Sequence, residues 1–199
     1  MSVIAPAFAD PVLATQAAFC TVMQAMARPA TVARIASDVA APVPLSRAAA
    51  AIALTLLDYE TAVWLDSALA QASDVADWIA FHTGAPRTDD PQQAAFAFVA
   101  EPELVPAFDR FALGNDEYPD RSTTVVLQVK QMIAGEGISF AGPGIAKTQT
   151  LRASPLPSDF QPRLIANRDL FPRGIDLILA TDNEIAALPR SLRVVGEGG

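Results

Sequence analysis

"DLFPRGIDLIL", residues 169–179, contains the residue of this chain that most needs an explanation. The segment predicts a turn followed by a buried strand over 174–180, because its apolar residues form an almost continuous run. Asp176 interrupts that run. A carboxylate inside a strand core is strongly destabilising unless it is paired or hydrogen-bonded, so the sequence predicts a partner or a ligand for Asp176.

Two arginines are candidate partners for this carboxylate. Arg173 in "FPRG" precedes Asp176 by three residues, and Arg190 in "LPRS" follows a second predicted strand, 184–189. If the two strands form a hairpin in the sheet, both arginines can lie on the same edge. The simplest interpretation is a structural pair of Asp176 with Arg173, or a backbone-capping role for Asp176. The sharper alternative is an anion site that uses both arginines.

The chain upstream alternates between helical and extended patterns. Asp10 can cap a first helix that begins at Pro11 and ends before Pro29, with apolar residues at helical spacing: Val12, Phe19, Val22, Met23 and Met26. Ser46 can cap a second, alanine-rich helix that extends to residue 58. The other expected elements are strands over 30–36, 61–65 and 94–99, a helix over 73–82 and a weaker helical stretch over 104–114.

Further downstream, 122–130 is expected to pair with 137–142 as an antiparallel hairpin, and 154–171 reads as a loop that leads into a helix. Alternating helices and strands with a late hairpin predict a three-layer α/β/α fold around a mixed sheet. We expect a single domain over 1–195 and a flexible tail over 196–199.

Composition excludes several classes of function. The chain has 199 residues, of which 51% are hydrophobic and 18% charged, with a net charge of -8. Because its 14 basic residues form no cluster, a nucleic-acid partner is not expected. The N-terminus lacks the features of a signal peptide and no apolar run is long enough to span a membrane, so we expect a cytoplasmic protein.

Cysteine and histidine are too scarce for most metal sites. The single cysteine, Cys20, excludes an internal disulfide, and its place in a helical pattern predicts a small core residue. One histidine without a cysteine cluster leaves only scattered carboxylates as ligands, so no metal site is expected.

Two short motifs resemble loops that are found in catalytic sites. "GISFAG" resembles a nucleophile elbow centred on Ser139, but no helix follows and His82 precedes the serine, so a strand residue is the better interpretation. "AGPGIAKT" resembles the end of a phosphate loop but has Ala141 and Ala146 where that motif needs glycines. Gly142 and Gly144 could still allow an anion to approach the backbone; the commoner alternative is a tight turn.

His82, in "FHTGAPR", is open to two interpretations. A histidine at the end of a helix can interact with the last free carbonyls, while Gly84 takes a left-handed conformation and Pro86 prevents continuation. Alternatively His82, Thr83 and Arg87 contribute to a ligand site.

Seven segments, in order along nearly the whole chain, together resemble one protein family. They are Phe19, Ala25, Met26 and Pro29 in the first helix, "LTL.D..T.VWL" (54–65), "FHTGAP" (81–86), "P..A.FAF" (91–98), "GPGI" (142–145), "FPRGIDLIL" (171–179) and "LPR" (188–190). This pattern is similar to the H subunit of the bacterial carbon-phosphorus lyase system, the PhnH family. Ala30 departs from it, because the family commonly has glycine there.

The resemblance implies a fold similar to the large domain of transferases that use pyridoxal phosphate, without their cofactor site, and a homodimer. The sequence agrees on the cofactor, since neither of its two lysines, Lys130 and Lys147, has the context of a Schiff-base lysine. Family members act with the G, I and L subunits to displace adenine from ATP by a phosphonate, giving a ribose 1-phosphonate 5-triphosphate. The J subunit then breaks the carbon-phosphorus bond.

Three hypotheses follow for this chain. In the first, it is an auxiliary subunit that dimerises and binds the G, I and J subunits. In the second, five residues converge with the Gly142–Gly144 turn on a nucleotide or phosphonate pocket: His82, Thr83, Arg173, Asp176 and Arg190. The third is an independent small-molecule transferase with His82 as general base, for which no nucleophile is apparent. The first is favoured, with no catalytic residue of its own.

Overall fold

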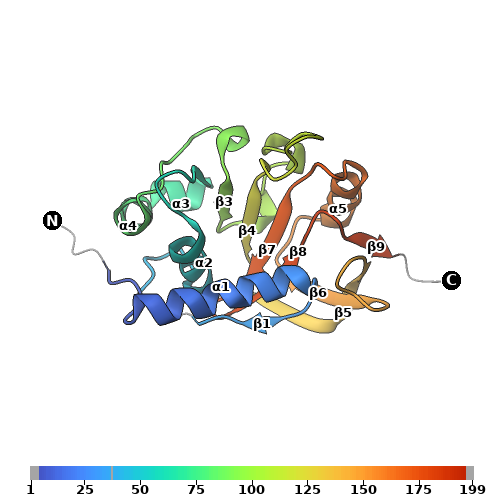
Figure 1. Cartoon of the computed structure of the whole chain (residues 1–199), viewed down its shortest axis with the longest axis horizontal. Helices are drawn as coiled ribbons and strands as arrows, with labels where there is room; N and C mark the ends of the chain where they lie inside the picture. Colours follow the sequence, from blue (N-terminus) through green and yellow to red (C-terminus); the bar gives the residue numbers. More distant parts are fainter. Residues whose placement is uncertain (1–4, 37, 196–199) are drawn as a thin grey trace.

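The structure, a computed structural model, describes residues 5–36 and 38–195, so the predicted tail 196–199 lies outside the described residues. A six-stranded sheet with the order β1-β8-β7-β4-β3-β2 forms the centre (Figure 1). Its strands are β1 (Ala33–Arg34), β2 (Val63–Leu65), β3 (Phe96–Val99), β4 (Thr124–Gln128), β7 (Asp176–Ala180) and β8 (Glu184–Leu188). β2, β3, β4 and β7 are parallel, whereas β8 pairs antiparallel with both β7 and β1.

Helices cover one face of this sheet. α1 (Pro11–Ala27), α2 (Arg47–Leu56) and α4 (Ser73–Thr83) pack on it, and the short α3 (Ser67–Gln71) precedes α4. The predicted caps are confirmed: Asp10 Oδ1 accepts a hydrogen bond from Leu13 N at 3.2 Å, and Ser46 Oγ accepts one from Ala49 N at 3.2 Å. These side chains fix where α1 and α2 begin.

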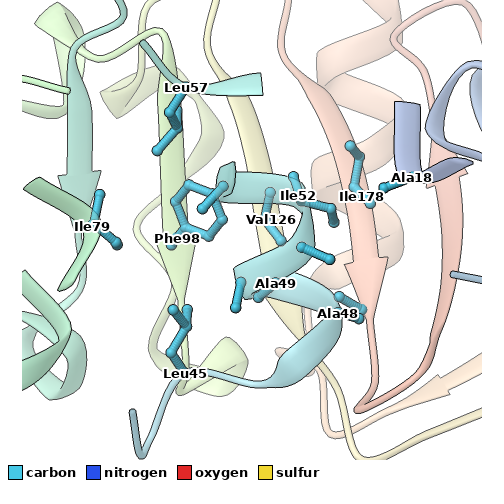
Figure 2. Close-up of a cluster of buried hydrophobic side chains, with 14 of the residues drawn as sticks. Ala18, Leu45, Ala48, Ala49, Ile52, Leu57, Ile79, Phe98, Val126 and Ile178 are labelled. Atoms are coloured by element: carbon cyan, nitrogen blue, oxygen red, sulfur yellow. The ribbon is translucent and has the colours of Figure 1, made fainter. Parts of the chain in front are cut away.

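The centre of this layer is α2. Six consecutive residues of the helix, Ala48–Ala53, are buried, and five of them are alanines. Ala49 and Ile52 lie over Phe98 of β3 and Val126 of β4, while Ala18 of α1 lies near Ile178 of β7 (Figure 2). Small side chains let the helix approach the sheet closely, so α2 is buried almost all round.

A smaller sheet and one helix cover the other face. β5 (Gln131–Ala141) lies between β6 (Gln149–Ser154) and β9 (Arg193–Val195), and α5 (Phe160–Asp169) stands beside them. Aromatic residues link this layer to the main sheet, among them Phe108, Phe111, Phe140 and Phe160. Three 3₁₀ turns complete the chain: η1 (Pro91–Gln93), η2 (Pro102–Leu104) and η3 (Phe108–Arg110).

The fold is therefore mixed α/β with a six-stranded mixed sheet, as expected, but its third layer is only partly helical. The predicted pairing of 122–130 with 137–142 is wrong. β4 instead lies inside the main sheet between β3 and β7, and β5 pairs with β6 and β9. Gly135 and Gly137, both with positive φ, lie within β5 where its register with β6 shifts; they form a bulge rather than the predicted turn.

Two further expectations are corrected. The segment 104–114 contains 3₁₀ turns instead of an α-helix, and Pro106 within it cannot donate a helical hydrogen bond. Cys20 is exposed and is not a core residue. α1 turns Ala18, Val22 and Ala25 toward the core, so the apolar stripe that predicted the helix points largely outward.

Candidate functional site

The nearly buried carboxylate of Asp176 is bound by Arg190. The antiparallel register of β7 and β8, in which Leu177 faces Leu188, brings Arg190 to the first residue of β7. Asp176 Oδ1 accepts hydrogen bonds from Arg190 N at 2.8 Å and from Arg190 Nε at 3.1 Å. Asp176 Oδ2 accepts a hydrogen bond from Arg190 Nη2. The carboxylate therefore accepts hydrogen bonds both from the backbone amide that follows β8 and from the guanidinium of the same arginine.

The rest of the guanidinium is also engaged. Arg190 Nη1 donates to the carbonyl oxygen of Pro119, and Nη2 donates to Ser122 Oγ. Only 14% of each side chain of the pair is exposed. This arrangement joins the start of β7, the end of β8 and the segment that leads into β4. Because each charge already has partners, an incoming anion would have to displace the Asp176 carboxylate.

Arg173 does not pair with Asp176, contrary to the simplest interpretation of the sequence. Its Nε lies 3.4 Å from Asp116 Oδ1; the Arg173 side chain is nearly half exposed and that of Asp116 largely exposed. Arg173 N donates to Leu170 O in the turn that follows α5. The turn carries the Arg173 side chain away from the strand, and the exposed pair with Asp116 contributes little to stability.

His82 and Thr83 form the last turn of α4. His82 Nε2 lies 3.0 Å from the carbonyl oxygen of Ala5, which also accepts a hydrogen bond from Trp78 Nε1 at 2.9 Å. Thr83 Oγ1 donates to Ile79 O and accepts from Ala85 N. Gly84 has the left-handed conformation, with φ 71°. The left-handed end of α4 at Gly84 is therefore confirmed, whereas the His82 side chain contacts Ala5 O of the N-terminal segment instead of the last carbonyls of α4.

Gly142 and Gly144 form a tight turn after β5. The amide of Ile145 donates to Gly142 O at 3.1 Å. A Cβ on Gly144 would lie 2.2 Å from the carbonyl oxygen of Ala27 at the end of α1, so no other residue fits there without displacement of the backbone. The turn interpretation is confirmed, and its role is to let the loop approach α1 closely.

The seven candidate residues lie in separate places. A Cβ on Gly142 would lie 3.3 Å from the carbonyl oxygen of Ser191, the residue after Arg190, so the glycine turn and the Asp176–Arg190 pair lie near each other. His82 and Thr83 belong to α4, which is at the opposite end of the molecule from α5 and β9 (Figure 1). One pocket lined by all seven is not formed. Whether any of them binds a nucleotide or a phosphonate stays a prediction.

Asp66 and Asn167 are two of the buried polar residues that were not predicted from the sequence. Asp66, directly after β2, accepts hydrogen bonds from three amides: Leu69 N, Ala100 N and Glu101 N, at 2.9, 2.8 and 3.0 Å. Asn167 of α5 exchanges two hydrogen bonds with the backbone of Ile175, each 2.9 Å long. A polar residue directly after "VWL" was the available signal for Asp66; nothing local to α5 identifies Asn167.

Ser139 is a strand residue, as expected. Its hydroxyl lies 3.1 Å from that of Thr150 on the paired strand β6. A hollow of about 280 Å³ lies beside it, lined by Gly137, Ile138, Ser139, Gln161 and Val195. With no base or acid among these residues, the hollow offers no catalytic chemistry.

The remaining candidate groups are the two lysines and the side chains that could bind a metal ion. Lys130 and Lys147 are both exposed. Within residues 5–36 and 38–195, no three His, Cys, Asp or Glu side chains are grouped closely enough to hold a metal ion. In the same residues, every helix is too short or too polar to cross a bilayer.

Comparison with known proteins connects the chain to phosphonate metabolism. The profile of a family described as "Bacterial phosphonate metabolism protein (PhnH)" matches residues 6–195. A protein of Rhizobium meliloti (strain 1021), named "Alpha-D-ribose 1-methylphosphonate 5-triphosphate synthase subunit PhnH", is 44% identical over 191 residues, 96% of this chain and 95% of its own length. "Putative C-P lyase subunit protein HtxG" of Stutzerimonas stutzeri is 32% identical over 108 residues, 54% of each chain.

Proposed function

Because this chain belongs to the PhnH family of bacterial phosphonate metabolism proteins, we propose that it is a subunit of a ribose 1-methylphosphonate 5-triphosphate synthase within the carbon-phosphorus lyase system. The observation that carries the proposal is 44% identity to a protein of that name, spread over 96% of the chain. A likeness of that extent concerns the whole fold rather than one shared motif.

The proposed role is auxiliary. With the G, I and L subunits, the chain would serve the reaction in which a phosphonate displaces adenine from ATP and forms ribose 1-phosphonate 5-triphosphate. We place it in the cytoplasm, as a homodimer that binds the G, I and J subunits. We assign no catalytic residue and no pyridoxal phosphate to the chain itself.

The use of the family-like motifs in the structure supports an assembly role. "FHTGAP" ends α4 and holds the N-terminal segment, and the glycine of "GPGI" at position 144 lets a loop approach α1. Asp176 of "FPRGIDLIL" binds Arg190 of "LPR". These residues contact other parts of the same chain and stabilise its fold. This is expected for a protein whose surface, rather than a pocket, carries the function.

Co-purification with the partner subunits tests the proposal. The chain would be expressed together with the G, I and J subunits of its own bacterium, purified once through a tag on this chain and once through a tag on the I subunit, and analysed by native mass spectrometry. We expect a stoichiometric assembly with two copies of this chain in both purifications. Recovery of the chain alone, with an assembly of G, I and J that lacks it, would overturn the proposal.

A further inference from the structure

Three exposed basic residues, Arg28, Lys147 and Arg193, lie around the tight turn after β5. Arg28 follows α1, whose last carbonyl oxygen would be only 2.2 Å from a Cβ on Gly144 in that turn. Lys147 is three residues beyond Gly144. Arg193 of β9 is paired in register with Ala141, the last residue of β5. We call Arg28, Lys147 and Arg193 the basic face.

The segments that meet at the basic face carry no acidic side chains. They are 11–36, 137–158 and 185–195, and none of them contains Asp or Glu. Glu136, the acidic residue of β5, already pairs with Arg152 of β6 at 3.0 Å. Within residues 5–36 and 38–195, no residue of the basic face takes part in an ion pair. The C-terminal end of α1 adds only about half a negative charge, which does not balance three positive ones.

The opposite charge is concentrated elsewhere in the chain. More than half of its 22 acidic residues lie in the segment 58–120, which contains only two basic residues, Arg87 and Arg110. This segment includes α3 and α4, and α4 is at the opposite end of the molecule from β9 (Figure 1). A chain with a net charge of -8 therefore keeps one face free of carboxylates. Such an asymmetry is typical of a protein that binds a partner of complementary charge.

We propose that the basic face binds an acidic segment on the surface of another protein. Small ligands are normally held in concave sites. The basic face instead consists of exposed side chains from three separate segments, so a protein segment with several carboxylates can pair with all of them. Contacts of this kind orient an approaching partner and speed its association. The inference goes beyond the proposed function by naming the chemistry of a contact; only the assignment of that contact to the G, I or J subunit rests on the proposed function.

An acidic peptide tests the basic face without partner subunits. Fluorescein-labelled decaglutamate would be titrated with the purified full chain at about 20 mM salt, where charges interact over about 20 Å, and its fluorescence anisotropy measured. We expect saturable binding in spite of the net charge of -8, and a loss of about tenfold or more in affinity at about 0.2 M salt. The triple variant Arg28→Glu, Lys147→Glu, Arg193→Glu should show no binding.

The matched control reverses three other exposed basic residues, Arg110, Arg121 and Lys130, to glutamate. In the part of the chain that the structure describes, these three are also without ion pairs, and both triple variants change the net charge by the same amount. The control keeps the basic face, so its affinity should fall by about threefold or less. Circular dichroism checks folding. A milder variant with glutamine at positions 28, 147 and 193 replaces the reversed one if that does not fold, and should still lose most of the binding.

Failure of the wild-type chain to bind decaglutamate, or equal losses in the two triple variants, would overturn the inference. So would displacement of the peptide by inorganic triphosphate where sodium chloride of the same ionic strength has no effect, because the face would then belong to a phosphate-bearing ligand.

Co-purification with the partner subunits separates this inference from the proposed function. We expect the variant with a reversed basic face to lose at least one of the G, I and J subunits, and the control variant to keep all of them. If the reversed variant keeps all three, the proposed function stands and the inference fails for these partners. If the wild-type chain binds decaglutamate but recovers no subunit, only the proposed function fails.

Discussion

Asp176 and Arg190 form a nearly buried ion pair across the β7–β8 hairpin, in which Asp176 Oδ1 lies 2.8 Å from the Arg190 backbone nitrogen and 3.1 Å from Nε. The same guanidinium donates to Pro119 O and Ser122 Oγ. The Arg190 side chain therefore satisfies polar groups from two other segments of the chain, and its removal leaves the Asp176 carboxylate with little water around it.

We expect Arg190→Ala to lower the free energy of unfolding by about 3 kcal/mol, because the remaining Asp176 charge stays largely buried without its guanidinium partner. Urea unfolding followed by tryptophan fluorescence measures this loss. The matched control is Arg152→Ala, which removes a pair with Glu136 whose side chains are about half exposed. Its cost should be below about 1 kcal/mol. Equal losses in the two variants would contradict a special role for Arg190.

The partner of Asp176 could not be predicted from local patterns in the sequence. Local rules located the caps at Asp10 and Ser46 because the contacts span only three residues. Arg173 was favoured over Arg190 for the same reason, its closeness in sequence. The true pairing depends on the register of β7 with β8, which local patterns do not supply.

The misplaced hairpin has a related cause. An apolar strand followed by Gly135 and Gly137 fits a strand-turn-strand pattern, yet both glycines lie inside β5. The choice between a turn and a bulge is made by β6 and β9, which pair with the same strand from later in the chain. The outward direction of Phe19 and Met23 was missed likewise, because helical spacing predicts an apolar stripe but does not state which of its residues face the core.

Ala30 provides a test of backbone strain. It is fully buried and has φ 57°, in the left-handed region where a non-glycine residue costs about 1–2 kcal/mol. Replacement by glycine removes that strain but loses a buried methyl group and adds freedom to the unfolded chain, at a combined cost of about 1–2 kcal/mol. We therefore expect Ala30→Gly to change the free energy of unfolding by less than about 0.5 kcal/mol, the difference of these opposing effects.

The control for this prediction is Ala51→Gly. Ala51 is equally buried but lies inside α2, where glycine brings no relief of strain. Loss of helix propensity and of the methyl group should there cost about 1.5–2 kcal/mol. Urea unfolding compares the two variants; a similar loss in both would show that Ala30 is not strained.

Asp182 should contribute to stability in a pH-dependent way. Hydrogen bonds from the Arg47 side chain lower the pKa of Asp182 below its ordinary value. A carboxyl group with a lowered pKa stabilises the folded state above its unfolded pKa of about 3.9, and this stabilisation is lost as the pH falls through the folded pKa. Because the pair is half exposed, Asp182→Asn should cost only about 0.5 kcal/mol at pH 7.

This difference between wild type and Asp182→Asn should disappear on acidification below the folded pKa, where the wild-type carboxyl is also neutral. Urea unfolding at neutral and strongly acidic pH measures it. Asp89→Asn is the control, since Asp89 is 96% exposed and lies 3.8 Å from Arg87. A deficit of Asp182→Asn that persists unchanged in acid would show that packing rather than charge is responsible.

The isolated chain should not bind the substrates of the proposed reaction. Calorimetric titration with ATP or methylphosphonate is expected to give only heat of dilution, because the Arg190 guanidinium is occupied by Asp176, Ser122 and Pro119. A saturable isotherm that is weakened by Arg173→Ala, and left unchanged by Arg152→Ala at another exposed arginine, would instead favour the ligand-binding hypothesis.

His82 should be dispensable for phosphonate use. In His82→Ala the contact of Nε2 with Ala5 O is lost, but Trp78 Nε1 still donates to that oxygen and Gly84 still ends α4. We expect a stability loss of about 1 kcal/mol, typical of one hydrogen bond, and normal growth on methylphosphonate as phosphorus source in a strain that lacks its own copy. Failed growth of His82→Ala at normal cellular abundance, measured by immunoblot, would assign His82 a role in chemistry or ligand binding.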